Sequence, residues 1–542
     1  MTAACVAAAE GRSVLLLEQA PVIGGTTAIS GGMVWIAANH KAAATQHADS
    51  LEAARSYLDA TVQSVAPERM NAFLAHGDEA VRYLEAHTAL RLQAVTRYPD
   101  YYPDLAGATL GGRVLEPVPF DASVLGPAFK MLRDPLPEFT LFGGMMISRQ
   151  DILHLRRMTR SWRSALHVAR LLSRYALERL KARRGTTLYL GNALAARLWL
   201  STRQLGVCVR TEVCAERLVQ EGGRICGVEV SSLGETTLIR ARQGVILCTG
   251  GLSHGGNLRA RFVPPAAGTL SASVKPGNAV RGAQLALDAG ARLSASTSQG
   301  AFWVPASLFT RRDGSQGVFP HTVTDRAKPG LIAVGLDGKR FVNEAVSYHE
   351  FVRAQLAQEA LAVPAFLLCD SSFLWKYGLG RIKPFSLSHK AAVQEGYLTR
   401  ASSVAELAVQ LGLPGAALSA TLAHYNRHAR HGQDPLFGRG NNAYQRHLGD
   451  ADQRPNPCVA PLETAPFYAV KVWPADLGMS SGIVTDALAR ALDSAGQPIP
   501  GLYACGNDMA SVMEGAYPGP GITLGPALTF AYLAARHAAQ RN

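Results

Sequence analysis

Residues 18–32 read Glu18-Gln19-Ala20-Pro21-Val22-Ile23-Gly24-Gly25-Thr26-Thr27-Ala28-Ile29-Ser30-Gly31-Gly32, and this stretch decides the fold that we expect. It follows a short apolar run at residues 13–17, which is typical of a buried parallel strand that ends in a carboxylate. In a dinucleotide-binding βαβ unit, such a carboxylate accepts hydrogen bonds from ribose hydroxyls. We therefore expect Glu18 to contact a nucleotide.

Four glycines and several hydroxyls alternate just after that acid. Bare backbone can lie flat against a phosphate or a flat ring, while Ser and Thr hydroxyls donate hydrogen bonds. The sequence therefore predicts cofactor contacts from Glu18, Gly24, Gly25, Thr26, Thr27, Ser30, Gly31 and Gly32.

The alanine-rich residues 2–9 precede Gly11 and predict a helix that ends at a glycine. A nucleotide-binding acid stands about twenty residues after a G-x-G-x-x-G turn, and counting back from Glu18 passes Met1. Without that strand and turn we expect reduced affinity for the cofactor. A start codon assigned downstream of the true one is the favoured explanation, and a shortened, inactive chain is the alternative.

A second informative stretch lies near the C-terminus, where Tyr517-Pro518-Gly519-Pro520-Gly521-Ile522-Thr523-Leu524 precedes a predicted helix that runs to about His537. Tyrosine donates a hydrogen bond, and glycine leaves a backbone N–H accessible at the positive end of the helix dipole. Tyr517 and Gly521 are therefore predicted to hold a neutral carbonyl oxygen. Thr523 and Leu524 are predicted to contact the cofactor.

These motifs resemble the FAD-binding half of the fumarate reductase and 3-ketosteroid dehydrogenase flavoprotein superfamily, whose signature is E-x(5)-G-G-(T/S)-(T/S)-x-x-S-G-G. Residues 244–251 and 501–507 agree in order with that superfamily. The resemblance implies an α/β fold with a discontinuous, Rossmann-like FAD-binding domain, its first strand absent, and an inserted α+β substrate-capping domain. The implied limits are 1–295 and 471–542 for the FAD-binding domain and 296–470 for the insert. FAD contacts are also implied for Thr249, Gly250, Gly506 and Asn507.

Three tyrosine sites together look like the catalytic pattern of 3-ketosteroid Δ1-dehydrogenases. The resemblance implies that Tyr517 and the Gly521 N–H hold the C3 carbonyl, and that Tyr348, in an N-E-x-x-x-Y stretch, takes the C2 proton. It also implies that Tyr101, with Tyr102 as the alternative, supports Tyr348, and that the C1 hydride passes to flavin N5. The expected function is insertion of a C=C bond beside a ketone, above all in a 3-ketosteroid, with a quinone-like electron acceptor.

Two other functions stay open. A fumarate-reductase-like enzyme needs Arg and His side chains for a dicarboxylate, whereas this chain has Ala516-Tyr517-Pro518-Gly519 at the corresponding place. A neutral carbonyl compound is therefore favoured. The other alternative is a truncated, non-catalytic flavoprotein.

Composition argues against several other classes of protein. The 542 residues are 48% hydrophobic and contain no run of eighteen apolar residues, so no transmembrane helix or secretory signal is expected. The eight cysteines form no C-x-x-C pair and are expected to be buried thiols in a reducing cytoplasm, without a metal site.

Much of the +13 net charge comes from residues 151–184, which carry ten basic and two acidic side chains interleaved with apolar ones. This pattern predicts a basic amphipathic helix. We expect it to pack on the body with a solvated basic face. The alternative is an interfacial helix that touches anionic lipid at the inner face of the membrane and collects an apolar substrate or a quinone. Nucleic-acid binding is not expected, because no aromatic stacking platform accompanies the charge.

Overall fold

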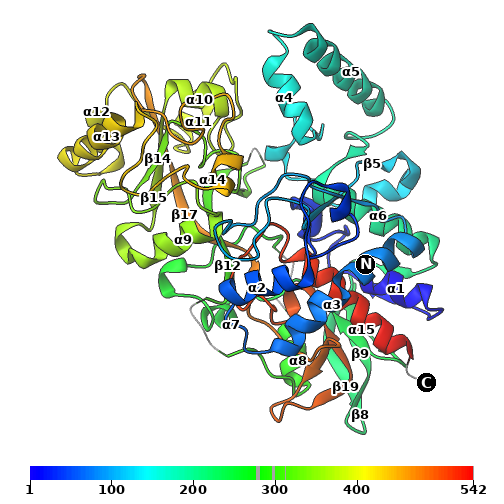
Figure 1. The fold of residues 1–542 in the computed structure, drawn as a ribbon. Coiled ribbons are helices and arrows are strands. Elements are labelled where there is room, and N and C mark those ends of the chain that lie inside the picture. Colours follow the sequence, from blue (N-terminus) through cyan, green and yellow to red (C-terminus); the bar gives the residue numbers. More distant parts are fainter. Residues whose placement is uncertain (276–280, 296–298, 312, 541–542) are drawn as a thin grey trace.

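The computed structural model describes residues 1–275, 281–295, 299–311 and 313–540. Two lobes share the chain, and a pair of helices stands apart from both (Figure 1). One lobe contains both ends of the sequence. The other is formed largely by residues 299–479.

The lobe with the chain ends contains two pairs of parallel strands. Strand β1 (Leu15–Leu17) pairs with β7 (Cys208–Arg210), and β11 (Val245–Leu247) pairs with β19 (Pro498–Ala504), beside which β18 (Arg490–Leu492) lies antiparallel. Helix α1 (Thr2–Ala9) precedes β1 and ends shortly before Gly11, which has a φ of +77°. The expected helix, glycine stop and short strand are therefore confirmed, as is the α/β class.

No described strand joins these two pairs into one sheet. The three leucines of β1 are only partly buried, as are Val245 and Ile246 of β11. A separate antiparallel sheet consists of β8 (Cys214–Glu221), β9 (Arg224–Ser232) and β10 (Glu235–Arg240).

The other lobe is built on a sheet in which the long strand β17 (Phe467–Met479) is central. The strand order is β13 (Gln316–Pro320), β12 (Ala301–Thr310), β17, β15 (Ala365–Asp370) and β14 (Leu331–Val334), with β16 (Thr399–Ala401) also paired to β17. Its helices are α9 (Tyr348–Ala357), α10 (Ser371–Tyr377), α11 (Lys390–Gln394), α12 (Val404–Leu411), α13 (Gly415–Ala429) and α14 (Ala443–Leu448). The expected domain limits stay predictions, because residue 296 lies outside the described residues and residue 470 lies within β17.

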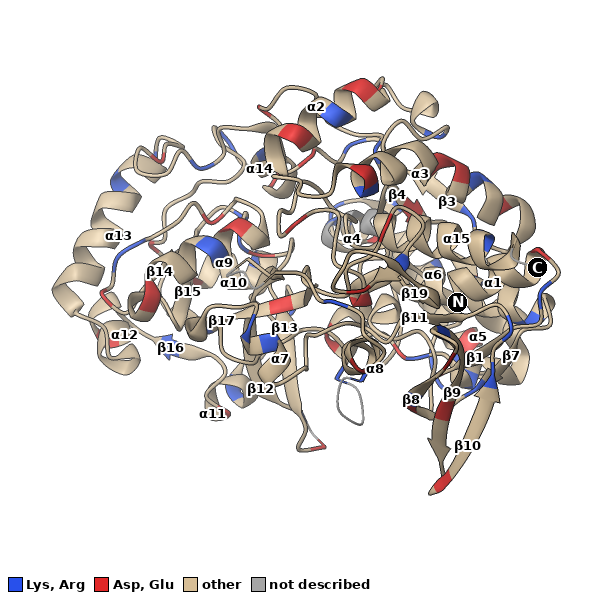
Figure 2. Cartoon of the chain, turned by 90° about the horizontal axis from the view of Figure 1, so that it is seen from below, with Lys and Arg blue, Asp and Glu red and all other residues tan. Residues whose placement is uncertain are grey.

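Helix α15 (Leu524–Gln540) is buried along most of its length beneath α1 and α3 (Pro67–His87). The other helices of this lobe are α2 (Leu51–Thr61), α6 (Leu190–Gln204), α7 (Asn257–Ala260) and α8 (Gly282–Asp288). Short strands β2 (Val34–Trp35), β3 (Leu92–Ala94) and β4 (Val114–Pro117) form a small sheet, and β5 (Phe120–Asp121) pairs with β6 (Thr187–Leu188). Acidic and basic residues are visible along the outer helices α2 and α3 (Figure 2).

The basic segment forms two helices rather than one. Helix α4 (Arg149–Arg157) ends before a turn, and α5 (Trp162–Arg179) starts anew with Ser161 as its N-cap. The expectation of one continuous helix over 151–184 is therefore wrong. Val168, Leu171 and Tyr175 are buried on one side of α5, and the helix pair extends away from the two lobes (Figure 1).

The cysteines also differ from the expectation. Cys208 and Cys248 are exposed, although Cys5, Cys369, Cys458 and Cys505 are buried as expected. No helix among the described residues is long and apolar enough to cross a membrane.

Strand β2 lies so close to residues 519–525 that glycine is required there. A Cβ on Gly525 would lie 2.2 Å from the backbone oxygen of Trp35, although Gly525 is in the first turn of α15. By contrast, a Cβ on Gly415, at the start of α13, would meet only the Cβ of Ala408 at 3.8 Å.

We predict that Gly525→Ala destabilises the protein despite the higher helix propensity of alanine. Overpacking costs about 1–3 kcal/mol or more, which outweighs a propensity gain of up to about 1 kcal/mol. Urea unfolding followed by circular dichroism measures the difference. Gly415→Ala is the matched control and should be neutral or stabilising by up to about 1 kcal/mol. Equal effects of the two substitutions would contradict the role of backbone contact with β2.

Candidate active site

Three tyrosines from distant parts of the chain meet in the interior. Tyr101 lies on the loop after β3, Tyr348 is the first residue of α9, and Tyr517 precedes α15. The Tyr101 hydroxyl donates to the Tyr348 hydroxyl at 3.0 Å. The Tyr517 ring stacks on Tyr101 at a centroid distance of 5.6 Å and meets Tyr348 edge-on at 5.1 Å. All three side chains are buried.

Gly521 lies in the same C-terminal segment as Tyr517. Its φ is +94°, and a Cβ there would stand 2.7 Å from the carbonyl carbon of Met33, so the backbone needs glycine. The Gly521 oxygen accepts a hydrogen bond from the Trp35 N–H at 3.1 Å, and within the described chain the Gly521 N–H has no protein acceptor. A polar ligand atom can therefore use this N–H.

The position of Tyr101 depends on a buried carboxylate. Asp100 accepts hydrogen bonds from the Trp35 indole at 2.9 Å and from Arg113 at 2.7 Å, and Arg113 also pairs with Asp49. The Tyr101 N–H donates to the Pro518 oxygen at 2.9 Å. This backbone contact ties the Tyr101 loop directly to the segment that carries Tyr517.

Tyr102, the alternative to Tyr101, is directed elsewhere. Its hydroxyl donates to Glu350 at 2.8 Å. Of the two neighbouring tyrosines, Tyr101 is therefore the one whose hydroxyl contacts Tyr348.

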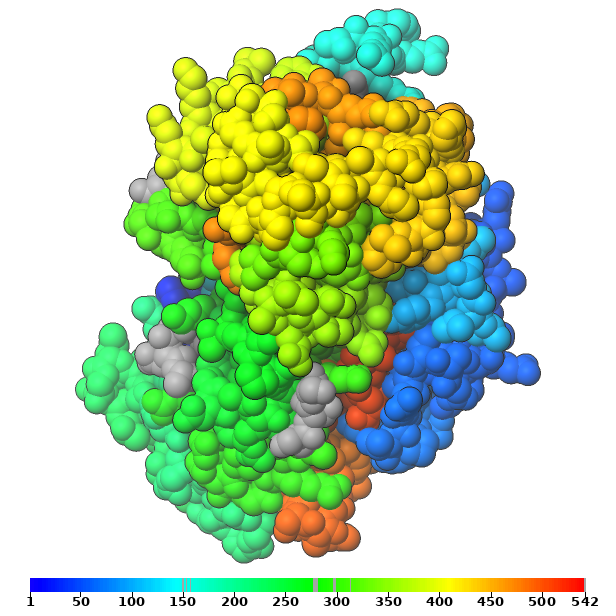
Figure 3. Space-filling model, turned by 90° about the vertical axis from the view of Figure 1, so that its left-hand side faces the viewer, coloured from blue at the N-terminus to red at the C-terminus, as the bar shows by residue number. Residues whose placement is uncertain are grey.

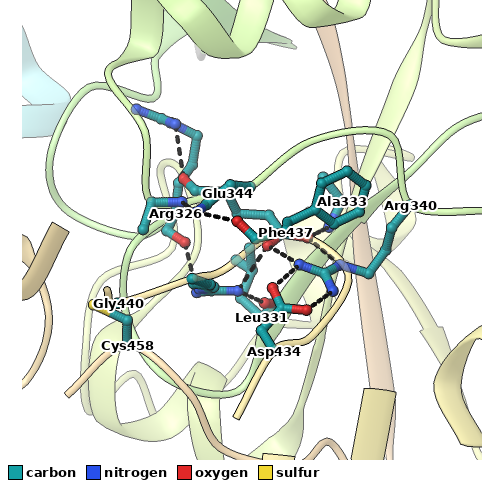
Figure 4. Close-up of polar contacts among 12 residues, drawn as sticks. Arg326, Leu331, Ala333, Arg340, Glu344, Asp434, Phe437, Gly440 and Cys458 are labelled. Atoms are coloured by element: carbon teal, nitrogen blue, oxygen red, sulfur yellow. Dashed lines mark hydrogen bonds and ion pairs between the residues drawn. The ribbon is translucent and has the colours of Figure 1, made fainter. Parts of the chain in front are cut away.

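The residues that precede Tyr348 are held by a buried ionic network, shown in Figure 4. Glu344 pairs with Arg340 at 2.7 Å and with Arg439 at 3.0 Å, and Arg340 also pairs with Asp434. Asn343 donates to the Phe437 oxygen at 3.0 Å. Asn343 and Glu344 of the N-E-x-x-x-Y stretch therefore anchor the loop, whereas Tyr348 faces the tyrosine cluster.

A further buried cation supports the same loop. Arg326 donates to the backbone oxygens of Glu344 at 2.9 Å and Val346 at 3.1 Å, besides two carbonyls of its own loop. The charge of this guanidinium acts on the phenols of Tyr444, Tyr101 and Tyr348. Since a nearby cation favours an ionised phenol, Arg326 contributes to the electrostatics of the cluster.

Burial dominates the acidity of these phenols. It raises the pKa values of Tyr348 and Tyr101 well above the usual value, and it raises the pKa of Tyr517 to about 12. The hydrogen bond from Tyr101 opposes this shift and lowers the pKa of Tyr348. Within the cluster Tyr517 is the more acidic of the Tyr348–Tyr517 pair, because the hydrogen bond from Tyr348 lowers its pKa. A carbonyl that accepts from Tyr517 would hold that phenol neutral, since a phenolate cannot donate.

Further residues, which the sequence motifs did not reveal, also line the tyrosine cluster. Tyr444 of α14 lies 4.7 Å from Tyr101 between ring centroids, and Phe302 of β12 lies 5.4 Å from Tyr517. His349 is 5.6 Å from Tyr517 and accepts a hydrogen bond from the Trp303 N–H. No local motif marks Tyr444 or Phe302.

The glycines predicted to face a cofactor include four with open space where a side chain would be. A Cβ built on Gly25, Gly31, Gly250 or Gly506 meets no atom within 4 Å. Gly24 and Gly32 instead pack tightly, Gly24 against Ala28 and Gly32 against the start of α6. The open backbone has the form expected for close approach of a flat cofactor, so the residues present fit FAD.

Hydrogen bonds fix the loops on which these glycines stand. Ser30 accepts from the Gly32 N–H at 3.0 Å, Thr26 accepts from the Val274 N–H, and Glu18 accepts from the Ala20 N–H at 2.9 Å. Thr27 lies in a short helical turn with Ala28 and Ile29.

Asp508 joins the two turns that follow β11 and β19. It accepts from the Thr249 hydroxyl at 2.9 Å and from the Gly251 N–H at 3.0 Å. Gly506, Asn507 and Thr523 line one cavity of about 20 Å³, and Leu524 begins α15 next to it. The structure thus brings together the predicted cofactor residues of the β11 turn, the β19 turn and the start of α15.

The surface over these elements is shared by several parts of the chain. In the space-filling view of Figure 3, a strip of the C-terminal segment, coloured red, is visible between the green and the blue parts of the molecule. Among the described residues, no group of three or more His, Cys, Asp or Glu side chains is placed to hold a metal ion.

Comparisons with known proteins show the family of the chain. The model of the FAD binding domain family matches residues 1–524. A 4-oxocyclohex-2-ene-1-carboxylate 5-dehydrogenase from Sinomonas cyclohexanicum is 36% identical over 100% of this chain and 92% of its own length. A 3-oxosteroid 1-dehydrogenase from Mycolicibacterium smegmatis is 35% identical over 99% of this chain and 94% of its own length.

A solved structure is similar over the whole fold. The crystal structure of 3-ketosteroid Δ1-dehydrogenase from Sterolibacterium denitrificans, in complex with 1,4-androstadiene-3,17-dione, matches with a TM-score of 0.92 and 36% identity. The match covers 99% of this chain and 97% of that one. The chain therefore belongs to the FAD-binding flavoprotein family of the 3-oxosteroid 1-dehydrogenases, as an FAD-dependent oxidoreductase that acts on CH–CH donors.

Proposed function

We propose that the protein removes two hydrogens from the carbons next to a ring ketone, with a 3-ketosteroid as the substrate, and forms a C1=C2 bond. The observation that carries this proposal is the buried contact of Tyr101, Tyr348 and Tyr517 beside Gly521. The 3-oxosteroid 1-dehydrogenases among the relatives support it.

In this proposal the Tyr517 hydroxyl and the Gly521 N–H both donate to the C3 carbonyl oxygen. Two donors aimed at one oxygen stabilise the negative charge that develops there when a neighbouring C–H bond breaks. Burial of Tyr517 supports the role, because a hydrogen bond in a site that excludes water is stronger than one in solvent.

Tyr348 is the base that takes the proton from C2. The Tyr101 hydroxyl donates to the oxygen of Tyr348, which favours its ionised form, and the buried charge of Arg326 acts in the same direction. The second hydrogen leaves C1 with its electron pair, so the C1=C2 bond forms without net change in charge on the substrate. Bound FAD supplies the acceptor for that hydride.

The residues proposed to hold FAD are those with open backbone or ordered loops: Glu18, Gly24, Gly25, Thr26, Thr27, Ser30, Gly31, Gly32, Thr249, Gly250, Gly506, Asn507, Thr523 and Leu524.

A second candidate substrate is a small ring ketone that carries a carboxylate, because one relative is a 4-oxocyclohex-2-ene-1-carboxylate 5-dehydrogenase. A carboxylate in a closed site needs a paired cation. Arg326, whose charge acts on the phenols of the cluster, already donates to four backbone oxygens. A neutral steroid therefore fits the described site better.

We also propose that the α4–α5 pair contacts an anionic membrane, where an apolar substrate and a quinone-like electron acceptor are available. Trp162, Leu177 and Leu180 are 71%, 64% and 82% exposed. They stand among the exposed arginines Arg160, Arg163, Arg170, Arg174 and Arg179. Apolar side chains among basic ones are the pattern of a helix that lies in a lipid interface.

Replacement of the carbonyl donor or of the base should slow flavin reduction. We expect Tyr517→Phe and Tyr348→Phe each to lower the rate of flavin reduction by a 3-ketosteroid roughly 10²-fold or more. Stopped-flow absorbance of the flavin measures this step. Tyr102→Phe is the matched control and should be within about twofold of wild type, because its hydroxyl bonds Glu350 outside the cluster. Near-normal reduction in Tyr517→Phe or Tyr348→Phe would remove that residue from its role.

The pH dependence should reveal the contact between Tyr101 and Tyr348. Because only ionised Tyr348 accepts a proton and its pKa lies well above the usual value, the rate of flavin reduction should still rise with pH from 7 to 9. Tyr101→Phe removes a hydrogen bond to the charged form, worth about 1.5 kcal/mol, and should lower the rate about tenfold across this range. A rate in Tyr101→Phe that stays within about twofold of the rate in Tyr102→Phe at every pH from 7 to 9 would show that the contact does not tune the base.

Vesicle co-sedimentation tests the membrane proposal. We expect binding to vesicles with anionic lipid, weakened by high salt, and little binding to purely zwitterionic vesicles. The triple variant Trp162→Ser, Leu177→Ser and Leu180→Ser should bind at least about tenfold more weakly, because it removes three exposed apolar side chains. The double variant Leu233→Ser and Leu387→Ser, whose leucines are exposed elsewhere, is the control. Equal binding by both variants would contradict a docking role of α5.

A further inference from the structure

Two free cysteines lie side by side where the parallel strands β11 and β19 end. In the β11–β19 register, Leu247 is opposite Ala504, so Cys248 and Cys505 come next on the two strands. Their sulfur atoms are 3.1 Å apart. Directly opposed residues on neighbouring strands have Cα atoms about 5 Å apart, within the range that a disulfide spans.

The two thiols differ in access and in acidity. Cys248 is exposed and Cys505 is buried. The hydrogen bond from Cys505 lowers the pKa of Cys248, whereas the same contact and burial raise the pKa of Cys505. An accessible thiol with a lowered pKa beside a second thiol is the arrangement of a peroxide-sensitive cysteine and its resolving partner.

A nearby carboxylate also acts on both thiols. Asp508 follows Cys505 by three residues, and its charge raises the pKa values of both thiols. It is held by the Thr249 hydroxyl and the Gly251 N–H. The contact with Cys505 is the largest influence on the pKa of Cys248. Cys248 therefore stays the more acidic of the two thiols despite the charge of Asp508.

We propose that Cys248 and Cys505 are a modification site, at which hydrogen peroxide forms a reversible disulfide. The Cys248 thiolate attacks one peroxide oxygen, an S–O bond forms, the O–O bond breaks, and the departing hydroxide leaves as water after taking up a proton. Cys505 then attacks the Cys248 sulfur, an S–S bond forms, the S–O bond breaks, and a second water leaves. In total, two thiols are oxidised by two electrons and one peroxide is reduced to two waters.

The site lies next to the proposed flavin contacts but does not depend on the tyrosine chemistry. Cys248 directly precedes Thr249 and Gly250, and Cys505 directly precedes Gly506 and Asn507. A disulfide would connect the two turns covalently where Asp508 already connects them by hydrogen bonds. Disulfides in reducing compartments are mostly transient and redox-sensing, which suits a reversible bond at this place.

Peroxide titration of the purified native protein tests the proposal. After treatment, blocking of free thiols and digestion, we expect the loss of two of the eight thiols and a cross-linked peptide pair that contains Cys248 and Cys505. Dithiothreitol should restore both thiols. Cys505→Ser should instead accumulate sulfenic acid at Cys248, trapped by dimedone, because the resolving thiol is missing.

The control variant is Cys208→Ser, which removes the other exposed cysteine of the described chain. It should form the Cys248–Cys505 cross-link as wild type does. The proposal is overturned if wild-type protein keeps both thiols free at a peroxide concentration that oxidises Cys208. It is equally overturned if Cys248 passes to sulfinic acid without cross-linking to Cys505.

Discussion

The active-site geometry depends on direct backbone contact between β2 and residues 519–525. Side chains are absent at the three closest positions, because a Cβ on Gly519, Gly521 or Gly525 would overlap with atoms of Met33 or Trp35. The contact is secured by the hydrogen bond from the Trp35 N–H to the Gly521 oxygen. Since Tyr517 is four residues from Gly521 in the same rigid segment, the position of β2 fixes both expected carbonyl donors. The contact also places them at the start of the long buried helix α15.

Buried charged groups hold Tyr348 and Tyr101 in position without entering the tyrosine cluster. Glu344 and Asp434 balance Arg340 and Arg439, all of them buried, so this network carries no net charge. Buried ion pairs of this kind contribute little net stability, but loss of one partner leaves a charge unpaired at a cost of about 3–5 kcal/mol. The network therefore specifies one position for the loop before Tyr348. Arg113 has the corresponding role for Tyr101, through Asp100.

The sequence predicted the features that depend on local chemistry. The glycine loop at residues 24–32, the short strand before Glu18 and the helix after Leu524 follow from residue type and spacing, and the structure has them. Tyr517 was predicted from its own segment, but its meeting with Tyr101 and Tyr348 could be proposed only through a family resemblance, because that contact joins residues hundreds of positions apart. Tyr444 and Phe302 carry no local signal for the same reason. The turn between α4 and α5 was missed because the apolar pattern continues through it. The thiol pair was missed because Cys248 and Cys505 become neighbours only through the pairing of β11 with β19.

The use of phenols rather than carboxylates suits a dry site for the neutral ketone that we propose as the substrate. An ionised carboxylate costs several kcal/mol to bury unless a cation stays beside it, and such a pair would also attract a charged ligand. Neutral phenols can be buried with hydrogen bonds alone, as the Tyr101–Tyr348 contact shows. In the proposed reaction Tyr348 is ionised before it takes the proton, and the charge of Arg326, whose guanidinium donates to backbone oxygens, acts on that phenolate. Burial makes Tyr348 a weak acid and, for the same reason, makes its phenolate a strong base. The hydrogen bond from Tyr101 lowers the pKa of Tyr348 and so restores part of the ionised fraction that burial removes.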